Sequence, residues 1–106
     1  MPAVKKAKLS PQAVADLQGI CAYIAADNPE AANRVRDAIL HAADFLAENP
    51  QLGRQVLKAV SPHTQTRWLV VPKFRNYLLF YRPFQDTIVV IRILHAARDW
   101  TRFFIS

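Results

Sequence analysis

Apolar residues that recur every three or four positions indicate two helices in the first half of the chain. The apolar stripe of segment 10–28 consists of Val14, Leu17, Cys21 and Ile24, and that of segment 28–50 consists of Val35, Ile39, Ala42 and Leu46. Ser10–Pro11 and Asn28–Pro29 each supply an N-cap followed by a first-turn proline. Because the connection between the two segments is so short, we predict an antiparallel helical hairpin.

The pattern changes to strands in the second half. Segments 64–71, 76–82 and 87–94 are rich in β-branched and aromatic residues, and the short links 72–75 and 83–86 separate them. Links of this length favour an antiparallel meander. Segment 3–9 alternates weakly and carries lysines, so we expect it to be a short strand at a sheet edge. The intervening segment 51–63 is expected to be a loop.

The order of these elements, βααβββ, predicts an α+β fold. We expect a helical hairpin packed on one face of a mostly antiparallel sheet, with the opposite face partly free. A chain of 106 residues has the usual size of one domain, so residues 1–106 are expected to form a single unit with a short C-terminal tail. The sequence does not decide whether the tail is a helix or a strand.

Strand alternation assigns the charged residues of the last strand to its two faces. It places Arg92 on one face with Val90 and Leu94, and His95 on the other with Ile93. Arginines that share the face away from the helices would line a basic surface for phosphates or an acidic peptide. The alternative is that Arg92 pairs internally with Asp99 or Asp86, and the sequence leaves both interpretations open.

Net charge points to an anionic partner. The chain carries +6, with −1 over residues 1–53 and +7 over residues 54–106, and seven of the nine cations in the second half are arginine. Arginine pairs in a forked geometry with carboxylate or phosphate, which suits nucleic acid or an acidic protein segment. A solvated basic surface that serves solubility is the alternative.

Several classes of chemistry are disfavoured by the composition. Cys21 is the only cysteine, so an internal disulfide and a cysteine-rich zinc site are excluded. His41 and His63 lack ligand spacing, and neither a glycine-rich phosphate loop nor a nucleophile elbow is present, so we expect no metal and no cofactor. No apolar run has membrane-spanning length, which leads us to expect a cytoplasmic protein without a membrane partner.

The run FRNYLLFYRPFQDTIVVIRILHAARDW, preceded by NPQLGR, resembles the C-terminal half of the ParE branch of the RelE/ParE toxin superfamily. The predicted initial strand and helical hairpin agree with that family, and the most specific part is Tyr77–Asp99. The resemblance implies a toxin of a type II toxin–antitoxin system, held in a hetero-oligomer by an acidic, partly disordered antitoxin. ParE toxins act on DNA gyrase, trapping its complex with cleaved DNA, and perform no chemistry of their own.

RelE toxins instead cut mRNA on the ribosome, with a basic cluster and commonly a C-terminal tyrosine or histidine. This chain has no tyrosine after residue 81, which disfavours RNA cleavage. If it were a ribonuclease, Arg67, Arg92 and His95 would be the candidate catalytic residues. The residues expected to bind the antitoxin or the target are Arg67, Arg75, Arg82, Arg92, Arg98, Trp100, Arg102, Phe103 and Phe104.

Overall fold

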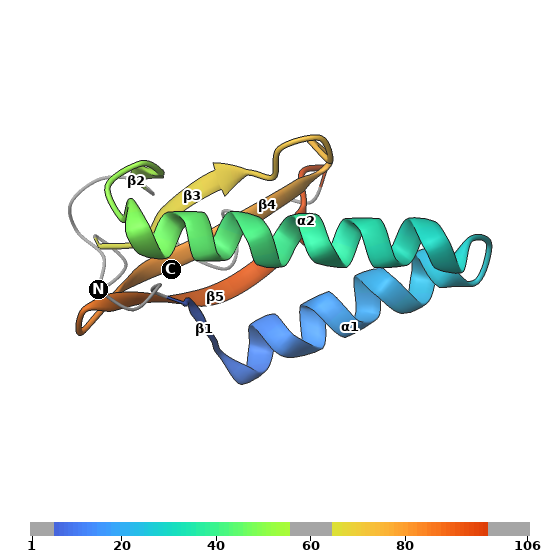
Figure 1. Ribbon diagram of the computed structural model, residues 1–106, viewed down its shortest axis with the longest axis horizontal. Helices are drawn as coiled ribbons and strands as arrows, with labels where there is room; N and C mark the ends of the chain where they lie inside the picture. Colours follow the sequence, from blue (N-terminus) through green and yellow to red (C-terminus); the bar gives the residue numbers. More distant parts are fainter. Residues whose placement is uncertain (1–5, 56–64, 98–106) are drawn as a thin grey trace, which may run out of the picture.

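Two helices packed on one face of a five-stranded sheet make up the described part of the protein (Figure 1). The computed structural model describes residues 6–55 and 65–97. The elements in chain order are β1 (Lys8–Leu9), α1 (Pro11–Ala25), α2 (Pro29–Glu48), β2 (Arg54–Gln55), β3 (Arg67–Val70), β4 (Tyr77–Phe84) and β5 (Thr87–His95). The predicted α+β class and the order of its main elements are confirmed.

Both helices begin at the predicted caps. The Ser10 hydroxyl accepts a hydrogen bond from the Ala13 N–H at 3.1 Å, and the Asn28 side chain accepts one from the Ala31 N–H at 3.1 Å. Each cap precedes a proline in the first turn. The cap satisfies an N–H that the helix cannot bond, and proline has no N–H to lose there. Local chemistry therefore sets both helix starts.

The sheet contains two strands beyond the predicted meander, in the order β1-β5-β4-β3-β2. Strands β3, β4 and β5 pair antiparallel as predicted, whereas β1 pairs parallel with β5 and β2 pairs antiparallel with β3. We had expected the β2 residues to lie in a loop, because a two-residue strand is too short to show alternation. Strand β4 also continues through Pro83 and Phe84, which the sequence had placed in a turn.

A β-bulge changes the faces of β5. Phe80 pairs with Arg92 while the next residue of β4, Tyr81, pairs with Val90, so Ile91 is the extra residue on β5. Val90 and the residue three positions later, Ile93, consequently both join the core on the helix side. The strict alternation predicted for this strand is therefore wrong beyond Val90.

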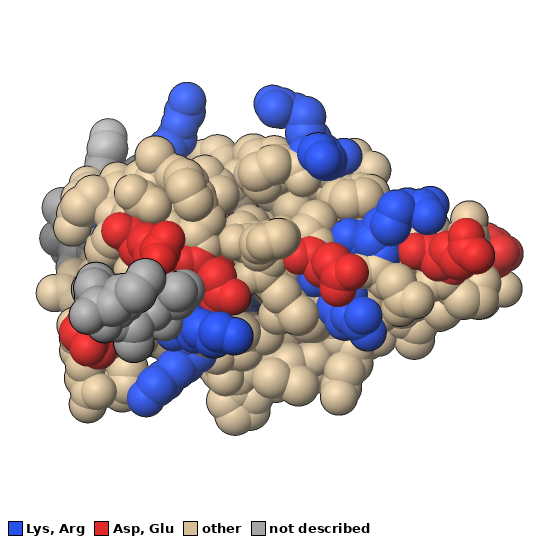
Figure 2. Space-filling model, in the orientation of Figure 1, with Lys and Arg blue, Asp and Glu red and all other residues tan. Residues whose placement is uncertain are grey.

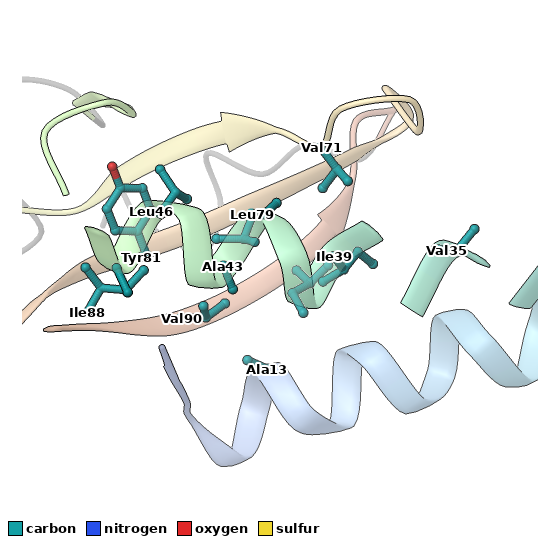
Figure 3. Close-up of a cluster of buried hydrophobic side chains, with 13 residues drawn as sticks. Ala13, Val35, Ile39, Ala43, Leu46, Val71, Leu79, Tyr81, Ile88 and Val90 are labelled. Carbon is teal, nitrogen blue, oxygen red and sulfur yellow. The ribbon is translucent and has the colours of Figure 1, made fainter. Parts of the chain in front are cut away.

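The main core lies between α2 and the sheet (Figure 3). The α2 residues predicted to face inward are all buried, namely Val35, Ile39, Ala42 and Leu46. In α1 the prediction was partly wrong, because Val14 is 40% exposed and its neighbour Ala13 is fully buried. Ala13, Leu17 and Ile20 follow the same helical spacing with a small rotation, and the smaller Ala13 lets α1 approach its neighbours closely.

The opposite face of the sheet has a small core of its own. Leu78, Phe80 and Leu94 are buried there, with Trp68 and Val70 packed against them. Its centre is therefore not the open surface that the sequence suggested. Accessible groups on this face lie around that buried centre.

Candidate functional site

Basic and aromatic side chains surround the buried centre of the sheet face that points away from the helices. We call this surface the outer face and define it by Lys8, Arg54, Trp68, Arg82 and Phe84. The Arg54 guanidinium lies 5.9 Å from the centre of the Trp68 ring, and the Lys8 ammonium lies 5.0 Å from that of Phe84. These are cation–π distances, so the rings help to hold the cations in place. Of the five residues that define this face, only Arg82 belongs to the binding set predicted from the sequence.

Arg82 is the arginine on this face whose side chain has an unmet hydrogen-bond donor. Its Nε is buried, and it donates to no acceptor in the described part of the chain. Alternation along β4 places Arg82 on the same side as Phe80 and Phe84. Buried donors nearly always have a partner, so this one marks a place where an external acceptor can bind.

Arg92 is held inside the molecule by Asp16 of α1. Its Nε and Nη2 donate to the two carboxylate oxygens at 2.8 and 3.0 Å, and the side chains of Arg92 and Asp16 are only 20% and 14% exposed. The hydrogen bond to Asp16 raises the pKa of Arg92 further, so the guanidinium stays charged. Arg92 is thus paired internally with Asp16, an acid that we had not considered, while Asp99 lies outside the described residues.

Asp16 also covers an edge of β5 that no strand of the described residues reaches. Strand β1 pairs only with Val89 and Val90. Beyond that point the Ser10 hydroxyl donates to the Ile91 carbonyl at 3.0 Å, and Asp16 accepts from the Ile93 N–H at 2.9 Å. The start of α1 therefore satisfies backbone groups that a further strand would otherwise bind. Asp16 is the only charged residue of α1, a sequence signal that could have identified it.

Arg67 is engaged by the loop between α2 and β2. It donates to the carbonyl of Gly53 at 2.6 Å, and to the carbonyl and side-chain oxygen of Gln51 at 3.3 and 2.7 Å. The neighbouring Tyr81 hydroxyl accepts from the Gly53 N–H and donates to the Pro50 carbonyl, both at 2.8 Å. Burial raises the pKa of Tyr81, although the Gly53 hydrogen bond and the Arg67 charge act in the opposite direction. We call this arrangement the loop clamp.

His95 lies at the rim of a cleft of about 670 Å³ between α1 and the adjoining ends of β4 and β5. Its ring meets that of Tyr77 edge-on at 5.5 Å, and its Nδ1 accepts a hydrogen bond from the Ala97 N–H. The cleft is lined by two carboxylates, Asp16 and Asp27, and by no lysine or arginine among the described residues. This cleft is therefore not the basic trough that the sequence predicted.

The three residues suggested for RNA cleavage do not share one site. Arg67 pairs across the sheet with Tyr81, and Tyr81 pairs with Val90, which lies five positions before His95. That separation corresponds to roughly 15 Å along β5. Arg67 is bound in the loop clamp and Arg92 is bound to Asp16, so both guanidinium groups are already engaged within the molecule.

The remaining predicted site residues divide between the surface and the undescribed segments. Arg75 is exposed in the turn between β3 and β4. Arg98, Trp100, Arg102, Phe103 and Phe104 lie outside the described residues. Within residues 6–55 and 65–97, no three potential ligands gather where they could hold a metal ion. No helix among these residues is long and apolar enough to cross a bilayer.

Comparison with known proteins gives a consistent family. The sequence profile described as the ParE toxin of the type II toxin–antitoxin system parDE matches residues 7–100. Two toxins of Caulobacter vibrioides are similar: Toxin RelE3 is 31% identical, with 88% of this chain and 96% of the relative covered, and Toxin RelE2 is 37% identical, with 82% and 90% covered. A structure titled as the chromosomal ParDE system of P. aeruginosa shares the fold, with a TM-score of 0.66 at 22% identity over 87% of this chain and 96% of the other.

Proposed function

The chain belongs to the ParE toxin family of type II toxin–antitoxin systems, and from this membership we propose that it inhibits DNA gyrase by binding to it. A cognate antitoxin would hold the toxin inactive in a hetero-oligomer. In this proposal the toxin forms and breaks no covalent bond in its target. Its surface residues stabilise one state of the gyrase–DNA complex through contacts alone.

The separation of Arg67, Arg92 and His95 supports binding over RNA cleavage. Cleavage of a phosphodiester needs a general base and cationic groups within hydrogen-bond reach of one reacting phosphate. Here Arg67 is bound to loop carbonyls, and its strand position is roughly 15 Å from the cleft at which His95 lies. Arg92 is engaged by the carboxylate of Asp16. A single phosphate cannot contact all three in this arrangement.

Ribosome-dependent mRNA cleavage is the second candidate function. The two Caulobacter relatives carry RelE names, and His95 is exposed, so its ring is accessible to a substrate. An imidazole on its own can act as a general acid or base near neutral pH. RNA cleavage would then depend on His95 alone and not on the combination of Arg67, Arg92 and His95.

We assign the antitoxin's acidic segment to the outer face. Arg82 offers a buried, unpaired Nε there, and a carboxylate is the natural acceptor for it. Arg75 adds an exposed guanidinium at the turn that leads into β4. Arg98, Trp100, Arg102, Phe103 and Phe104 remain proposed contacts for the antitoxin or the target.

The experiment that separates the two functions uses the full chain and its His95→Ala variant. We expect both proteins to inhibit supercoiling by purified gyrase within about twofold of each other and to accumulate cleaved DNA, since an exposed side chain at a cleft rim adds little to a distant contact. In a translating extract, mapping of mRNA 5′ ends should give no new ends. New ends that disappear with His95→Ala, together with undisturbed supercoiling, would replace this proposal by RNA cleavage.

A further inference from the structure

Charged residues are unevenly distributed along α2. Its first half contains Arg34 and Arg36 together with two acids, Glu30 and Asp37, whereas its second half contains Asp44 and Glu48 and no lysine or arginine. In Figure 2, basic and acidic side chains are mixed toward the N-terminal half of α2, whereas acidic ones lie over its C-terminal end. This acidic segment stands out in a chain whose net charge is +6.

Two local costs accompany this arrangement. Glu48 occupies the last turn of α2, where no basic residue is present and the helix dipole disfavours a negative charge by about 0.3–1 kcal/mol. Asp44 and Glu48 are also like charges four residues apart, which costs about 0.2–0.5 kcal/mol more. Asp44 accepts a hydrogen bond from the Ala7 N–H at 3.0 Å within the monomer, whereas Glu48 forms no ion pair with a described residue. An interaction outside the monomer therefore accounts better for Glu48.

The charged ends flank an exposed aromatic residue on the solvent side of α2. We define the α2 stripe as Arg34, Asp37, His41, Phe45 and Glu48, whose spacing of three or four places them on one side of the helix. All five are exposed, and Phe45 retains 53% of its surface. Neither Arg34 nor Glu48 forms an ion pair with another described residue; Asp37 makes only a surface pair with Arg36 at 3.4 Å.

We propose that the α2 stripe binds a second copy of this chain, with the two α2 helices antiparallel about a twofold axis near His41. Arg34 lies seven residues before His41 and Glu48 seven after it, about 21 Å apart along the helix. A twofold axis at the midpoint brings each Arg34 beside the partner's Glu48, so the complementary pair forms twice. Each Phe45 is then covered by the side of the partner helix that carries His41 and Asp37.

Charge complementarity selects a second copy over another occupant. A purely acidic segment would match Arg34 but meet Glu48, and a purely basic one would do the reverse. The stripe complements its own reversed sequence, which is the requirement of an isologous contact. The surface lies on the helix side of the molecule, so the outer face with Arg82 stays accessible. The proposal is therefore independent of the cellular target and of the antitoxin site.

The test measures self-association of the full chain by sedimentation velocity over a range of concentrations. Arg34→Glu and Glu48→Arg each turn two attractive contacts into two repulsive ones, and we expect each to weaken dimerisation about tenfold. The double variant restores the pairs with reversed sign and should return to within about threefold of the wild type. Phe45→Ala should weaken dimerisation without any change in charge.

Asp86→Arg is the matched control, because it makes the same charge change as Glu48→Arg at an exposed turn away from α2. It should leave the dimerisation constant unchanged. Circular dichroism establishes that each variant is folded. A wild-type chain that stays monomeric at every concentration overturns the proposal. The proposal is also overturned if the double variant does not recover the dimerisation that each single variant loses. The same holds if Phe45→Ala leaves the dimerisation constant unchanged.

Discussion

At the scale of single residues, the burial of Arg92 explains why α1 carries a carboxylate. A guanidinium removed from water is costly unless its donors meet acceptors. Asp16 supplies both of its oxygens to Arg92 and one of them also to the Ile93 N–H. One acid therefore accepts hydrogen bonds from three donors between α1 and β5. The role of Arg92 is to join these elements, and its pairing leaves little of it for an external partner.

Asp16→Ala should lower the free energy of unfolding by about 2–3 kcal/mol, because it leaves a largely buried guanidinium and a strand N–H without their carboxylate. Urea denaturation followed by circular dichroism measures this. The matched control is Asp37→Ala, which removes the carboxylate of the exposed pair with Arg36 and should cost at most about 0.5 kcal/mol. Equal costs for the two variants would mean that the Asp16 contact contributes no more than a surface pair.

At the scale of elements, the loop clamp fixes the path of the chain from α2 to β2. Tyr81 on β4 and Arg67 on β3 bind the loop carbonyls and the Gly53 N–H from beneath. Gly53 must approach the tyrosine closely: a Cβ there would lie 2.5 Å from the Tyr81 hydroxyl oxygen and 3.0 Å from the Trp68 carbonyl. Gly19, in contrast, has nothing within 4 Å of an added Cβ. A close contact therefore requires glycine at position 53, whereas no such contact requires it at position 19.

The two glycine-to-alanine variants should change stability in opposite directions. Gly53→Ala forces the buried Tyr81 ring or the loop to shift, so we expect a loss of about 1–3 kcal/mol in the free energy of unfolding. Gly19→Ala adds a methyl group in open space within α1, and its better helix propensity should add about 0.5–1 kcal/mol. Thermal and urea unfolding measure both. If Gly53→Ala leaves the free energy of unfolding unchanged, the residues of the loop clamp can shift to accommodate the added methyl group at no cost.

At the scale of the whole molecule, the positive charge of the second half is shared between internal and external uses. Arg67 and Arg92 serve internal contacts, while Arg54 and Arg82 lie on the outer face together with Lys8 from the first half. The acidic residues of α2 lie on the opposite side of the sheet. The outer face is therefore basic and suits the acidic antitoxin segment, whereas the helix side carries the α2 stripe proposed to bind a second copy of the chain.

Arg82→Gln should weaken the complex with the cognate antitoxin about tenfold, because a charge-assisted hydrogen bond to a carboxylate is lost at a desolvated position. Isothermal titration calorimetry at two salt concentrations measures this, and the salt dependence of binding should fall as well. Arg36→Gln, on the helix side, makes the same change in charge and should leave affinity within about twofold. If both variants bind the antitoxin like the wild type, its acidic segment docks elsewhere.

The sequence predicted correctly the features that depend on local interactions. The arginines of the candidate site show which features could not be predicted in this way. Arg82 was expected on the face away from the helices, and alternation along the regular strand β4 places it there. Arg92 was assigned by the same rule on β5, where the bulge at Ile91 makes the rule fail. Arg67 was placed on the correct strand, yet its loop partners lie 14 and 16 residues earlier in the chain. The sequence gives no signal for that contact.

The sequence alone determined the two helices, their caps, the antiparallel order of β3, β4 and β5, and the unequal distribution of charge, because each depends on neighbours within a few positions. The tertiary structure decided the parallel pairing of β1 with β5, the bulge, the loop clamp and the pairing of Arg92 with Asp16, a residue 76 positions away. A buried charge or backbone group binds whichever partner the fold brings within about 3 Å, and sequence separation has no part in that choice.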